Sequence, residues 1–410
     1  MLNKDGQREL AYVVRIDEIK PIPNYDRVEH ARVGGWWVIV KKDQFQVGDP
    51  AIYIEVDSKV PEKEPFMFLE KKHFKVKTQK MCKVISQGLL MHPNDFDWEA
   101  FYNERDCQWD IWDNSNIWNG NCHLEIGDFV TEKLGIVYAE DADNKRKAPS
   151  ADKYKKMAQR RPDIFRKPWA RWMMKRDWGK KVMFIFFGKK KDKKGGWPAW
   201  VVKTDEERCQ NMPWLFPGND EEWIATEKVD GTSTTFTIKD RGRKQVFHVC
   251  SRNVVFDTPE KGCYYDTNVY LEMAEKYNIK EVLQQMMKDF PEMDYITIQG
   301  ETFGEGIQKR TYGLTGHDFR AFNLIFGCGG AKRRCNPKEM TEILSRYGIP
   351  SVTIINEHFK IPATCDELLA MAEGESVYDK GMREGLVFRS KDGERSFKAV
   401  SNPFLLKYHS

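Results

Sequence analysis

The sequence predicts a mixed α+β protein in which a small β-barrel precedes a domain of mainly antiparallel sheets with flanking helices. Short strand-like segments separated by Gly, Pro, Asn or Asp fill residues 1–140, as they do in small barrels. A basic segment rich in aromatic residues covers 141–200. Over 201–410, strand-like and helical segments mix without simple alternation, which favours antiparallel sheets over a parallel one.

The chain is long enough for two or three domains, each with a buried core. It has 410 residues, of which 40% are hydrophobic and 13% aromatic. The longest apolar run, residues 182–187, is far shorter than the roughly 20 residues of a membrane helix. Nine cysteines without a Cys-x-x-Cys pair favour reduced thiols over zinc sites. We expect a cytoplasmic protein, with the nucleus as the alternative compartment and no membrane partner.

The barrel is predicted from five segments within residues 1–140. They are YVVRIDEIKPI, WWVIVKKDQF, DPAIYIEVDS, KMCKVISQGLLM and DFVTEKLGI. Each is short and rich in β-branched and aromatic residues, which is typical of strands. A polar stretch from 94 to 121 interrupts them, and we expect it to form a long loop.

The connector at 141–200 carries most of the chain's excess positive charge. The whole sequence has a net charge of +4, but residues 145–196 alone contain 20 Lys/Arg and 4 Asp/Glu, with tryptophans interleaved. Lys and Arg neutralise phosphates and aromatic rings stack on unpaired bases, so a polyanion partner is one interpretation. The other is a solvated linker with one or two short helices, since charge runs are usually soluble surface.

Helices and strands are both expected after residue 201. In KTDEERCQN, Thr204 and Glu207 have the spacing of a capping box at the start of a helix. Helical periodicity also marks TNVYLEMAEKYNIKEVLQQMMKDF, PKEMTEILSRYG and CDELLAMAEG. The strand-like segments are EKVDGTSTTFTI, interpreted as a β-hairpin, and then KQVFHVCSRN, YITIQGETFG, DFRAFNLIFG, EGLVFRS and RSFKAVS.

Strand alternation predicts which polar side chains share a surface. In YITIQGE, Ile296 and Ile298 point toward the core, so Glu301 points to the opposite face. In RSFKAVS, Phe397 and Ala399 share one face, which sends Lys398 to the other face. The same argument puts Lys228 and Asp230 on one side, and Gly231 permits a tight backbone after them.

Six short motifs follow one another in an order that resembles a known superfamily. They are KVDG at 228–231, SRN at 251–253, GETFGEG at 300–306, DFRAFNLI at 318–325, EGLVFR at 384–389 and SFKAVS at 396–401. This series is similar to the ordered motifs of covalent nucleotidyltransferases, which include DNA ligases, RNA ligases and mRNA capping enzymes. KVDG alone is a weak signal, but its five successors at compatible spacing make the resemblance specific.

Within this superfamily the sequence most resembles ATP-dependent RNA ligases. KTDEERCQN before the lysine, SRN after it and FKAVSNPFLLK at the end are similar to that family. DNA ligases and capping enzymes carry an OB domain after the last motif, whereas only nine residues follow Ser401 here. The predicted barrel at 1–140 instead resembles the branch with an N-terminal OB module, followed by a nucleotidyltransferase domain at 201–410.

The resemblance implies catalytic and metal-binding roles for four residues. Lys228 would attack the α-phosphorus of ATP and become the lysyl-adenylate. Lys398 would bind the nucleotide and neutralise the α-phosphate in the transition state. Asp230 and Glu384 would hold catalytic Mg²⁺, or Mn²⁺, through its waters.

Five further residues would bind the cofactor, again by resemblance. Glu227 would help to hold the adenine and Phe322 would stack on it, although Phe322 would pack in the core of such a strand in any case. Glu301 would accept hydrogen bonds from the ribose hydroxyls. Arg252 and Asn253 would contact ribose or phosphate, with a scaffold ion pair as the alternative for Arg252.

The nucleophile has to be a neutral amine, which an ordinary lysine is not. With a pKa of about 10.4, only about 0.1% is neutral near pH 7.5, so about 4 kcal/mol must come from desolvation and nearby positive charge. We expect Mg²⁺ beside Lys228 and the nearby Lys398 to supply it. A carboxylate would act in the opposite direction, so Asp230 and Glu384 are expected to contact metal-bound water rather than Lys228 itself.

The chain departs from the family at one position. Many members have a second lysine two residues after the one that matches Lys398, and here that residue is Val400. Lys407, a lysine of the barrel or a metal held by the barrel are the candidates to replace its contact with the leaving phosphates.

The sequence thus predicts an ATP-dependent RNA ligase that seals 5′-phosphate and 3′-hydroxyl ends, with nicked duplex as one candidate substrate. We expect it to act as a monomer. Two alternatives are a GTP-dependent capping-type guanylyltransferase and a non-catalytic RNA-binding protein on the same fold. The substitution at Val400 supports the second, whereas the presence of Lys228, Glu301, Glu384 and Lys398 argues against it.

Overall fold

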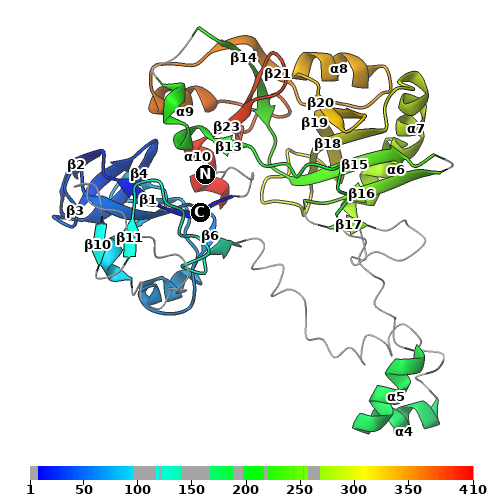
Figure 1. Ribbon diagram of the computed structural model, residues 1–410, viewed down its shortest axis with the longest axis horizontal. Helices are drawn as coiled ribbons and strands as arrows, with labels where there is room; N and C mark the ends of the chain where they lie inside the picture. The colour runs from blue at the N-terminus through cyan, green and yellow to red at the C-terminus, as the bar shows by residue number, and fades with distance from the viewer. Residues whose placement is uncertain are drawn as a thin grey trace. The chain divides into compact units, whose positions relative to one another are not determined.

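The computed structural model describes residues 8–96, 117–119, 122–139, 164, 167–187, 197–216, 220–242, 244–252, 254–256 and 268–409. Contacts divide the chain into two compact units, Tyr138–Gly196 and the remainder (Figure 1). None of the helices in the described part of the chain has the length and apolar character that crossing a bilayer requires. The further division of the larger unit into domains at 1–140 and 201–410 stays a prediction.

The N-terminal residues form a set of small antiparallel sheets. One sheet has the order β1-β5-β9 and another β2-β3-β4, with shorter pairs β7-β8, β10-β11 and β12-β6. Trp36, Val38, Ala51 and Tyr53 are among the buried residues of these sheets. The predicted loop at 94–121 lies largely outside the described residues. The strands are β1 (Ala11–Arg15), β2 (Glu18–Ile22), β3 (Tyr25–Val33), β4 (Trp36–Lys41), β5 (Pro50–Ile54), β6 (Ser58–Lys59), β7 (Gln79–Met81), β8 (Val84–Ser86), β9 (Leu89–Met91), β10 (Ile117–Asn119), β11 (Cys122–Leu124) and β12 (Val137–Tyr138).

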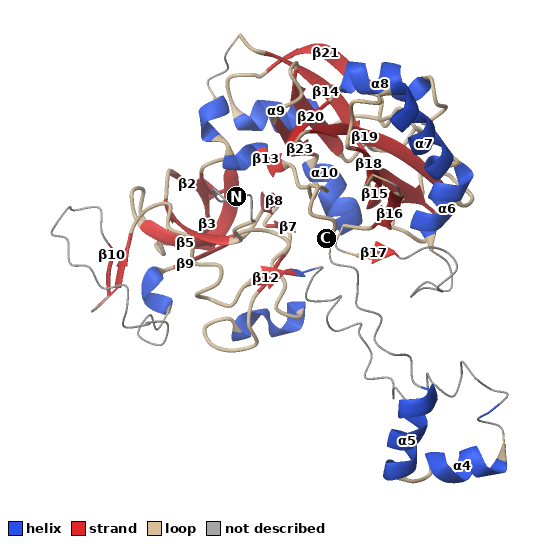
Figure 2. Cartoon of the chain, turned by 45° about the vertical axis from the view of Figure 1, so that its right-hand side comes forward, coloured by secondary structure: helices blue, strands red, loops and turns tan. Residues whose placement is uncertain are grey.

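The C-terminal residues build two larger sheets. A six-stranded antiparallel sheet has the order β17-β16-β15-β18-β19-β20, and a five-stranded sheet has the order β13-β23-β22-β14-β21, in which only β13 and β23 run parallel. Both are covered by helices, so the predicted α+β class is confirmed (Figure 2). The strands are β13 (Glu207–Arg208), β14 (Glu222–Lys228), β15 (Thr232–Asp240), β16 (Gln245–Cys250), β17 (Val255–Phe256), β18 (Tyr295–Gly304), β19 (His317–Cys328), β20 (Ala331–Arg334), β21 (Ile354–Lys360), β22 (Gly385–Ser390) and β23 (Ser396–Val400).

The hairpin predicted for EKVDGTSTTFTI is wrong. β14 ends at Lys228 and β15 begins at Thr232, but β14 pairs with β21 and β22 whereas β15 pairs with β16 and β18. The three residues between them carry the chain from one sheet to the other. Non-local pairing therefore overrides the local hairpin pattern.

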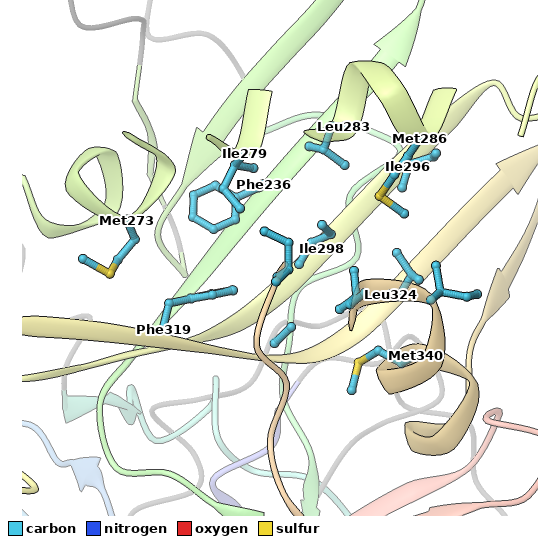
Figure 3. Packing of buried hydrophobic residues seen from close by; sticks show 14 of the residues in the cluster. Phe236, Met273, Ile279, Leu283, Met286, Ile296, Ile298, Phe319, Leu324 and Met340 are labelled. Carbon is cyan, nitrogen blue, oxygen red and sulfur yellow. The ribbon is translucent and has the colours of Figure 1, made fainter. Parts of the chain in front are cut away.

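Helices α6 (Val269–Lys276), α7 (Ile279–Asp289) and α8 (Pro337–Ser345) cover the six-stranded sheet. Met273 and Leu283 from the helices and Ile296 and Phe319 from the strands are buried together (Figure 3). The long helical pattern that begins at TNVYLE is two helices, because Asn278 adopts the left-handed conformation between them. Helix α9 (Cys365–Ala372) packs against β23 of the other sheet.

The capping box predicted at Thr204 and Glu207 is also wrong. No α-helix starts there: Glu207 begins β13, which pairs with β23, and Cys209–Asn211 form a short 3₁₀ helix. The Thr204 hydroxyl instead makes a hydrogen bond with Ser233 Oγ. Pairing with a strand nearly 200 residues away determines this segment, not its local pattern.

Asn211 joins the segment before Lys228 to the N-terminal sheets. Its side-chain oxygen accepts hydrogen bonds from Tyr12 Oη at 3.1 Å and Trp36 Nε1 at 2.6 Å, and its nitrogen donates to Glu55 and Glu207. The residue is only 3% exposed. All its hydrogen-bonding groups are therefore engaged in one buried network.

The smaller unit contains two helices, where one or two short helices were predicted for the connector. They are α4 (Pro168–Met174) and α5 (Asp177–Phe187). Pro168 occupies the first turn of α4, where a missing N–H costs nothing.

Candidate active site

Lys228 lies at the end of β14, where the chain leaves one sheet for the other. Three residues later Gly231 passes close to β18: a Cβ built there would lie 2.3 Å from the Thr302 carbonyl oxygen. The approach excludes any side chain, so the glycine is needed for its small size. The sequence expectation of a tight backbone after the lysine is therefore correct.

Lys228 forms a direct ion pair with Glu384. Its Nζ lies 2.7 Å from Glu384 Oε2, and the two side chains are 24% and 10% exposed. Glu384 precedes β22, whose first residue, Gly385, is the strand partner of Lys228. The expectation that Glu384 would contact metal-bound water rather than the lysine is wrong for this state, because the two strands place the side chains against each other.

The acidic surroundings hold the Lys228 amine in its charged form. Burial lowers its pKa, but Glu384, Glu301 and Asp230 more than offset this, and the pKa of Lys228 lies above the usual 10.5. The predicted neutral amine is thus not found in the ligand-free protein. Without a cation to neutralise them, the carboxylates stabilise the ammonium form of Lys228. The same effect is why Asp230 and Glu384 were predicted to hold a metal ion.

The two glutamates beside the lysine are themselves perturbed. Burial, together with the neighbouring Glu384 and Asp230 and despite Lys228, raises the pKa of Glu301 to about 8. Burial also raises the pKa of Glu384, which Lys228 partly counteracts. Several carboxylates crowded around one amine leave a surplus of acidic groups that favours a bound cation.

Lys398 lies on β23 and points toward Asp205, which lies in the segment before Lys228. Its Nζ is 3.4 Å from Asp205 Oδ1, and Arg8 and Arg252 contact the other oxygen of this carboxylate at 3.4 and 3.2 Å. Burial and the charges of Arg8, Arg208 and Lys228 lower the pKa of Lys398 to about 8, although Asp205 acts against this.

Asp205 is the acidic centre of that cluster. Burial would raise its pKa, but Lys398, Arg8 and Arg252 together lower it to about 2. Arg8 belongs to the N-terminal residues and Arg252 follows β16. Asp205 therefore ties three separate parts of the chain to the lysine of the last motif.

Strand alternation correctly places Glu301. Ile296 and Ile298 are fully buried in the core, whereas Glu301 lies on the opposite face and interacts electrostatically with Lys228 and Arg252. Phe397 and Ala399 are likewise buried on the core side of β23, opposite Lys398.

Comparisons with known proteins agree with this arrangement. Residues 221–408 match the family model named RNA ligase. This part of the chain is therefore similar to RNA ligases. Residues 10–93 match a model of an OB-fold domain, so the barrel predicted at the N-terminus is confirmed as an OB fold. A search of curated protein sequences found no match.

Solved RNA ligase structures from Naegleria gruberi are similar over nearly the whole chain. A complex with pyrophosphate is 25% identical, with a TM-score of 0.67, covering 97% of this chain and 98% of that one. A lysine-to-alanine variant with ATP and Mn is also 25% identical, with a TM-score of 0.68, covering 98% and 99%. A glutamate-to-alanine variant with AMP and Mn has the same identity, a TM-score of 0.67 and the same coverage.

Asp230 gives the ligase domain a carboxylate oxygen that fits a metal ion. The side chain is 5% exposed, and its Oδ2 has no hydrogen-bond partner, whereas Oδ1 lies 3.3 Å from His409 Nε2. Among the described residues no cluster of three or more His, Cys, Asp or Glu could hold a metal by itself. One or two carboxylates completed by water and phosphate oxygens is the usual arrangement for Mg²⁺. The residues present therefore fit a hard divalent cation.

Two other residues predicted to bind the nucleotide, Glu227 and Phe322, are buried or partly buried. The Glu227 carboxylate is 1% exposed and accepts hydrogen bonds from Ser376 Oγ and Val377 N, on the face of β14 away from Lys228. Phe322 is the extra residue of a β-bulge in the ligase domain, since Gln299 and Gly300 pair with the residues on either side of it.

The bulge leaves Phe322 half-buried at the edge of the core, and bulges often redirect a side chain toward a site. Asn253 lies outside the described residues. The roles predicted for Glu227, Phe322, Arg252 and Asn253 stay predictions.

The sequence analysis missed four residues at this site, which are Arg8, Asp205, Tyr312 and His409. Tyr312 Oη accepts the Asp230 backbone N–H at 2.7 Å, and Tyr312 holds the sparsely populated positive φ of 55°. Asp205 lies inside the KTDEERCQN motif and could have been predicted as a site residue. It was not, because this segment was interpreted as the start of a helix. Nothing local marks Arg8 or His409.

Val400 pairs with Gly385, the strand partner of Lys228. It is 3% exposed and closes the end of β23. The group that would replace the second lysine of the family motif stays a prediction.

Proposed function

We propose that the chain is an ATP-dependent RNA ligase that joins RNA ends through a covalent adenylate on Lys228. The observation that carries this proposal is a partly buried lysine 2.7 Å from Glu384, near Glu301, Asp230 and Lys398, at the sheet junction of a region similar to RNA ligases. The similarity to structures with ATP and Mn supports ATP as the nucleotide and a divalent metal ion as the cofactor.

The reaction would run in three displacements at phosphorus. The Lys228 nitrogen attacks the α-phosphorus of ATP, an N–P bond forms and pyrophosphate leaves. An oxygen of the RNA 5′-phosphate then attacks the same phosphorus, which releases the lysine and gives adenylylated RNA. Finally the 3′-hydroxyl attacks the 5′-phosphorus, seals the strand and releases AMP.

The residues of this chain would control the proton and the charge. In the ligand-free protein Glu384 holds the Lys228 ammonium by a hydrogen bond, so this contact must loosen before the amine attacks. A bound Mg²⁺ or Mn²⁺ would neutralise the carboxylates and the phosphate oxygens. Lys398, with a pKa of about 8, is mostly charged at neutral pH and would stabilise the negative charge on the α-phosphate.

The remaining contacts follow the same proposal. Glu301 would accept hydrogen bonds from the ribose hydroxyls and Phe322 would stack on the adenine, with Glu227 behind it. Arg252 and Asn253 would bind ribose or phosphate, and Asp230 would join Glu384 at the metal. Support for the metal role is the unpartnered Asp230 oxygen.

The substrate is RNA, and we propose ends with a 5′-phosphate and a 3′-hydroxyl, with a nicked duplex as one form. We also propose that the protein acts as a monomer, because Arg8, Lys228 and Lys398 of one chain meet at the site. Free thiols at Cys209 and Cys335 support a reducing compartment, the cytoplasm or nucleus. The domains would be 1–140, 141–200 and 201–410.

A sealing assay tests this function. The full chain is incubated with ATP and Mg²⁺ on nicked duplexes whose nick strands are all RNA, all DNA or mixed. Joining of 5′-phosphate to 3′-hydroxyl RNA ends with ATP, and not with GTP, is expected. Failure to join any RNA end with ATP would exclude a ligase. Transfer from GTP alone would indicate the capping-type alternative, which the similarity to RNA ligases does not favour.

A further inference from the structure

The helical hairpin of the smaller unit has a rigid corner between α4 and α5. The Arg176 amide donates to the Met173 carbonyl at 3.0 Å and the Lys180 amide to the Arg176 carbonyl at 2.9 Å. At Gly179 a Cβ would lie 2.2 Å from the Met173 carbonyl oxygen. Close approach of the two helices thus requires glycine at this position.

Three tryptophans of this hairpin are about half exposed, whereas other apolar side chains of the same helices are buried. Trp169, Trp172 and Trp178 are 49%, 51% and 54% exposed, whereas Ala170 and Met183 are 0% and 1% exposed. Trp172 and Trp178 pack edge to face with ring centroids 6.0 Å apart. Trp169 and Trp172 are three residues apart on α4 and share one side of it. The three rings therefore form one exposed aromatic surface.

Positive charge surrounds these rings. Residues 167–187 contain six Lys/Arg and a single acidic residue, Asp177. The Arg176 guanidinium lies 3.8 Å from the centre of the Trp172 ring, a cation–π contact. Arg171 lies on α4 and Lys175 directly follows that helix, and both side chains are exposed. We call Trp169, Trp172, Trp178, Arg171, Lys175 and Arg176 the hairpin surface.

We propose that the hairpin surface is a second RNA-binding site, separate from the catalytic centre, which binds unpaired nucleotides of the RNA substrate. Bases would stack on the tryptophan rings and the phosphates between them would lie against Arg171, Lys175 and Arg176. Positive charge fits a polyanion. Half-exposed aromatic rings fit unpaired bases, since a duplex stacks its bases internally. The proposal deepens the proposed function, because it rests on RNA being the substrate.

Binding of full-length chains to a labelled single-stranded oligoribonucleotide tests the proposal. The triple variant Trp169→Ala, Trp172→Ala, Trp178→Ala should lose roughly tenfold or more in affinity, since stacking contributes about 1–3 kcal/mol per base. The double variant Arg171→Gln, Lys175→Gln keeps the rings and their packing. It should reduce the slope of log affinity against log salt by about 1.4. Trp214→Ala, which removes a 67% exposed tryptophan of the ligase domain, is the matched control and should bind as wild type.

Self-adenylylation separates this proposal from the proposed function. Transfer of AMP from ATP to the protein needs no RNA, so both hairpin variants should adenylylate at the wild-type rate. If the wild-type chain did not adenylylate, the ligase assignment would fail while the RNA-binding comparison would still be valid. Loss of adenylylation in a hairpin variant would show that the hairpin takes part in catalysis. That result would overturn the proposal of a separate RNA-binding site.

Two further arms test the class of partner. A perfectly paired RNA duplex should bind the triple variant and the wild type with similar affinity. Anionic vesicles containing phosphatidylserine probe the alternative of a membrane surface, which the 75% exposed Phe186 on α5 makes worth measuring. Unchanged single-strand affinity in both variants would overturn the proposal. So would vesicle binding that the triple variant loses while its RNA affinity stays intact.

Discussion

Replacing Lys398 by methionine should make the protein more stable and inactive. Burial and nearby cations, among them Arg8 and Arg208, lower the pKa of Lys398 from 10.5 to about 8 despite Asp205. The difference corresponds to about 3 kcal/mol by which the charged side chain disfavours folding at neutral pH. Methionine has a similar length and no charge. We therefore expect Lys398→Met to stabilise the fold by up to about 3 kcal/mol at pH 7.

The size of this stabilisation should depend on pH. Below about pH 8 the lysine is charged in both folded and unfolded chains, and the folded state bears the full cost. As the pH rises from about 8 toward 10.5, the folded lysine loses its proton first and the wild type regains stability. The advantage of the methionine variant should thus be largest near pH 7 and shrink above pH 8.

Urea unfolding followed by tryptophan fluorescence measures this difference. Wild type and variant are compared at about pH 7 and about pH 9.5, with midpoints and slopes converted to free energies. Lys332→Met, at an exposed lysine on β20, is the matched control and should change stability little at either pH. A variant that is less stable than wild type at pH 7, or a difference that does not vary with pH, would refute the reasoning.

Three other substitutions have definite expected outcomes. Asn211→Ala removes four hydrogen bonds of a buried side chain. It should lower the free energy of unfolding by about 2–4 kcal/mol in the same urea experiment. A loss below about 0.5 kcal/mol would contradict the hydrogen-bond network. Gly231→Ala places a Cβ 2.3 Å from the Thr302 carbonyl oxygen and should slow AMP transfer by roughly 100-fold through displacement of the nucleophile; wild-type transfer in a folded variant would show that the turn has more room. Glu384→Gln removes a carboxylate 2.7 Å from Lys228 that we propose to hold the metal ion. AMP transfer should therefore fall and require more Mg²⁺, as measured in a Mg²⁺ titration. An unchanged Mg²⁺ dependence would show that Glu384 does not hold the metal.

Local patterns were enough to predict the features that depend on neighbouring residues. Alternation along single strands correctly placed Glu301 and Lys398 opposite their buried neighbours, because the direction of a side chain depends on backbone geometry within a few residues. The order of the motifs predicted the ligase domain, and the turn signals predicted the barrel.

Features that depend on distant residues could not be predicted in this way. The segment from Lys228 to Thr232 has the pattern of a hairpin, yet its two strands pair in different sheets. KTDEERCQN has the pattern of a helix start, yet Glu207 pairs with Phe397. In both cases tertiary pairing outweighs local propensity.

The electrostatics of the site are equally non-local. Lys228 meets Glu384 although 156 positions separate them in sequence, so the sequence indicated both residues but not their contact. The pKa of Lys398 depends on burial and on Arg8, about 390 positions earlier. Such values emerge only when the sheets are assembled.

The central claim is that Lys228 becomes covalently attached to AMP. The most direct measurement is peptide mapping by mass spectrometry after incubation of the full chain with ATP and Mg²⁺, beside a Lys228→Ala variant. We expect one AMP per chain, on the peptide that contains Lys228, and none on the variant. AMP on another residue, or equal labelling of the variant, would contradict it.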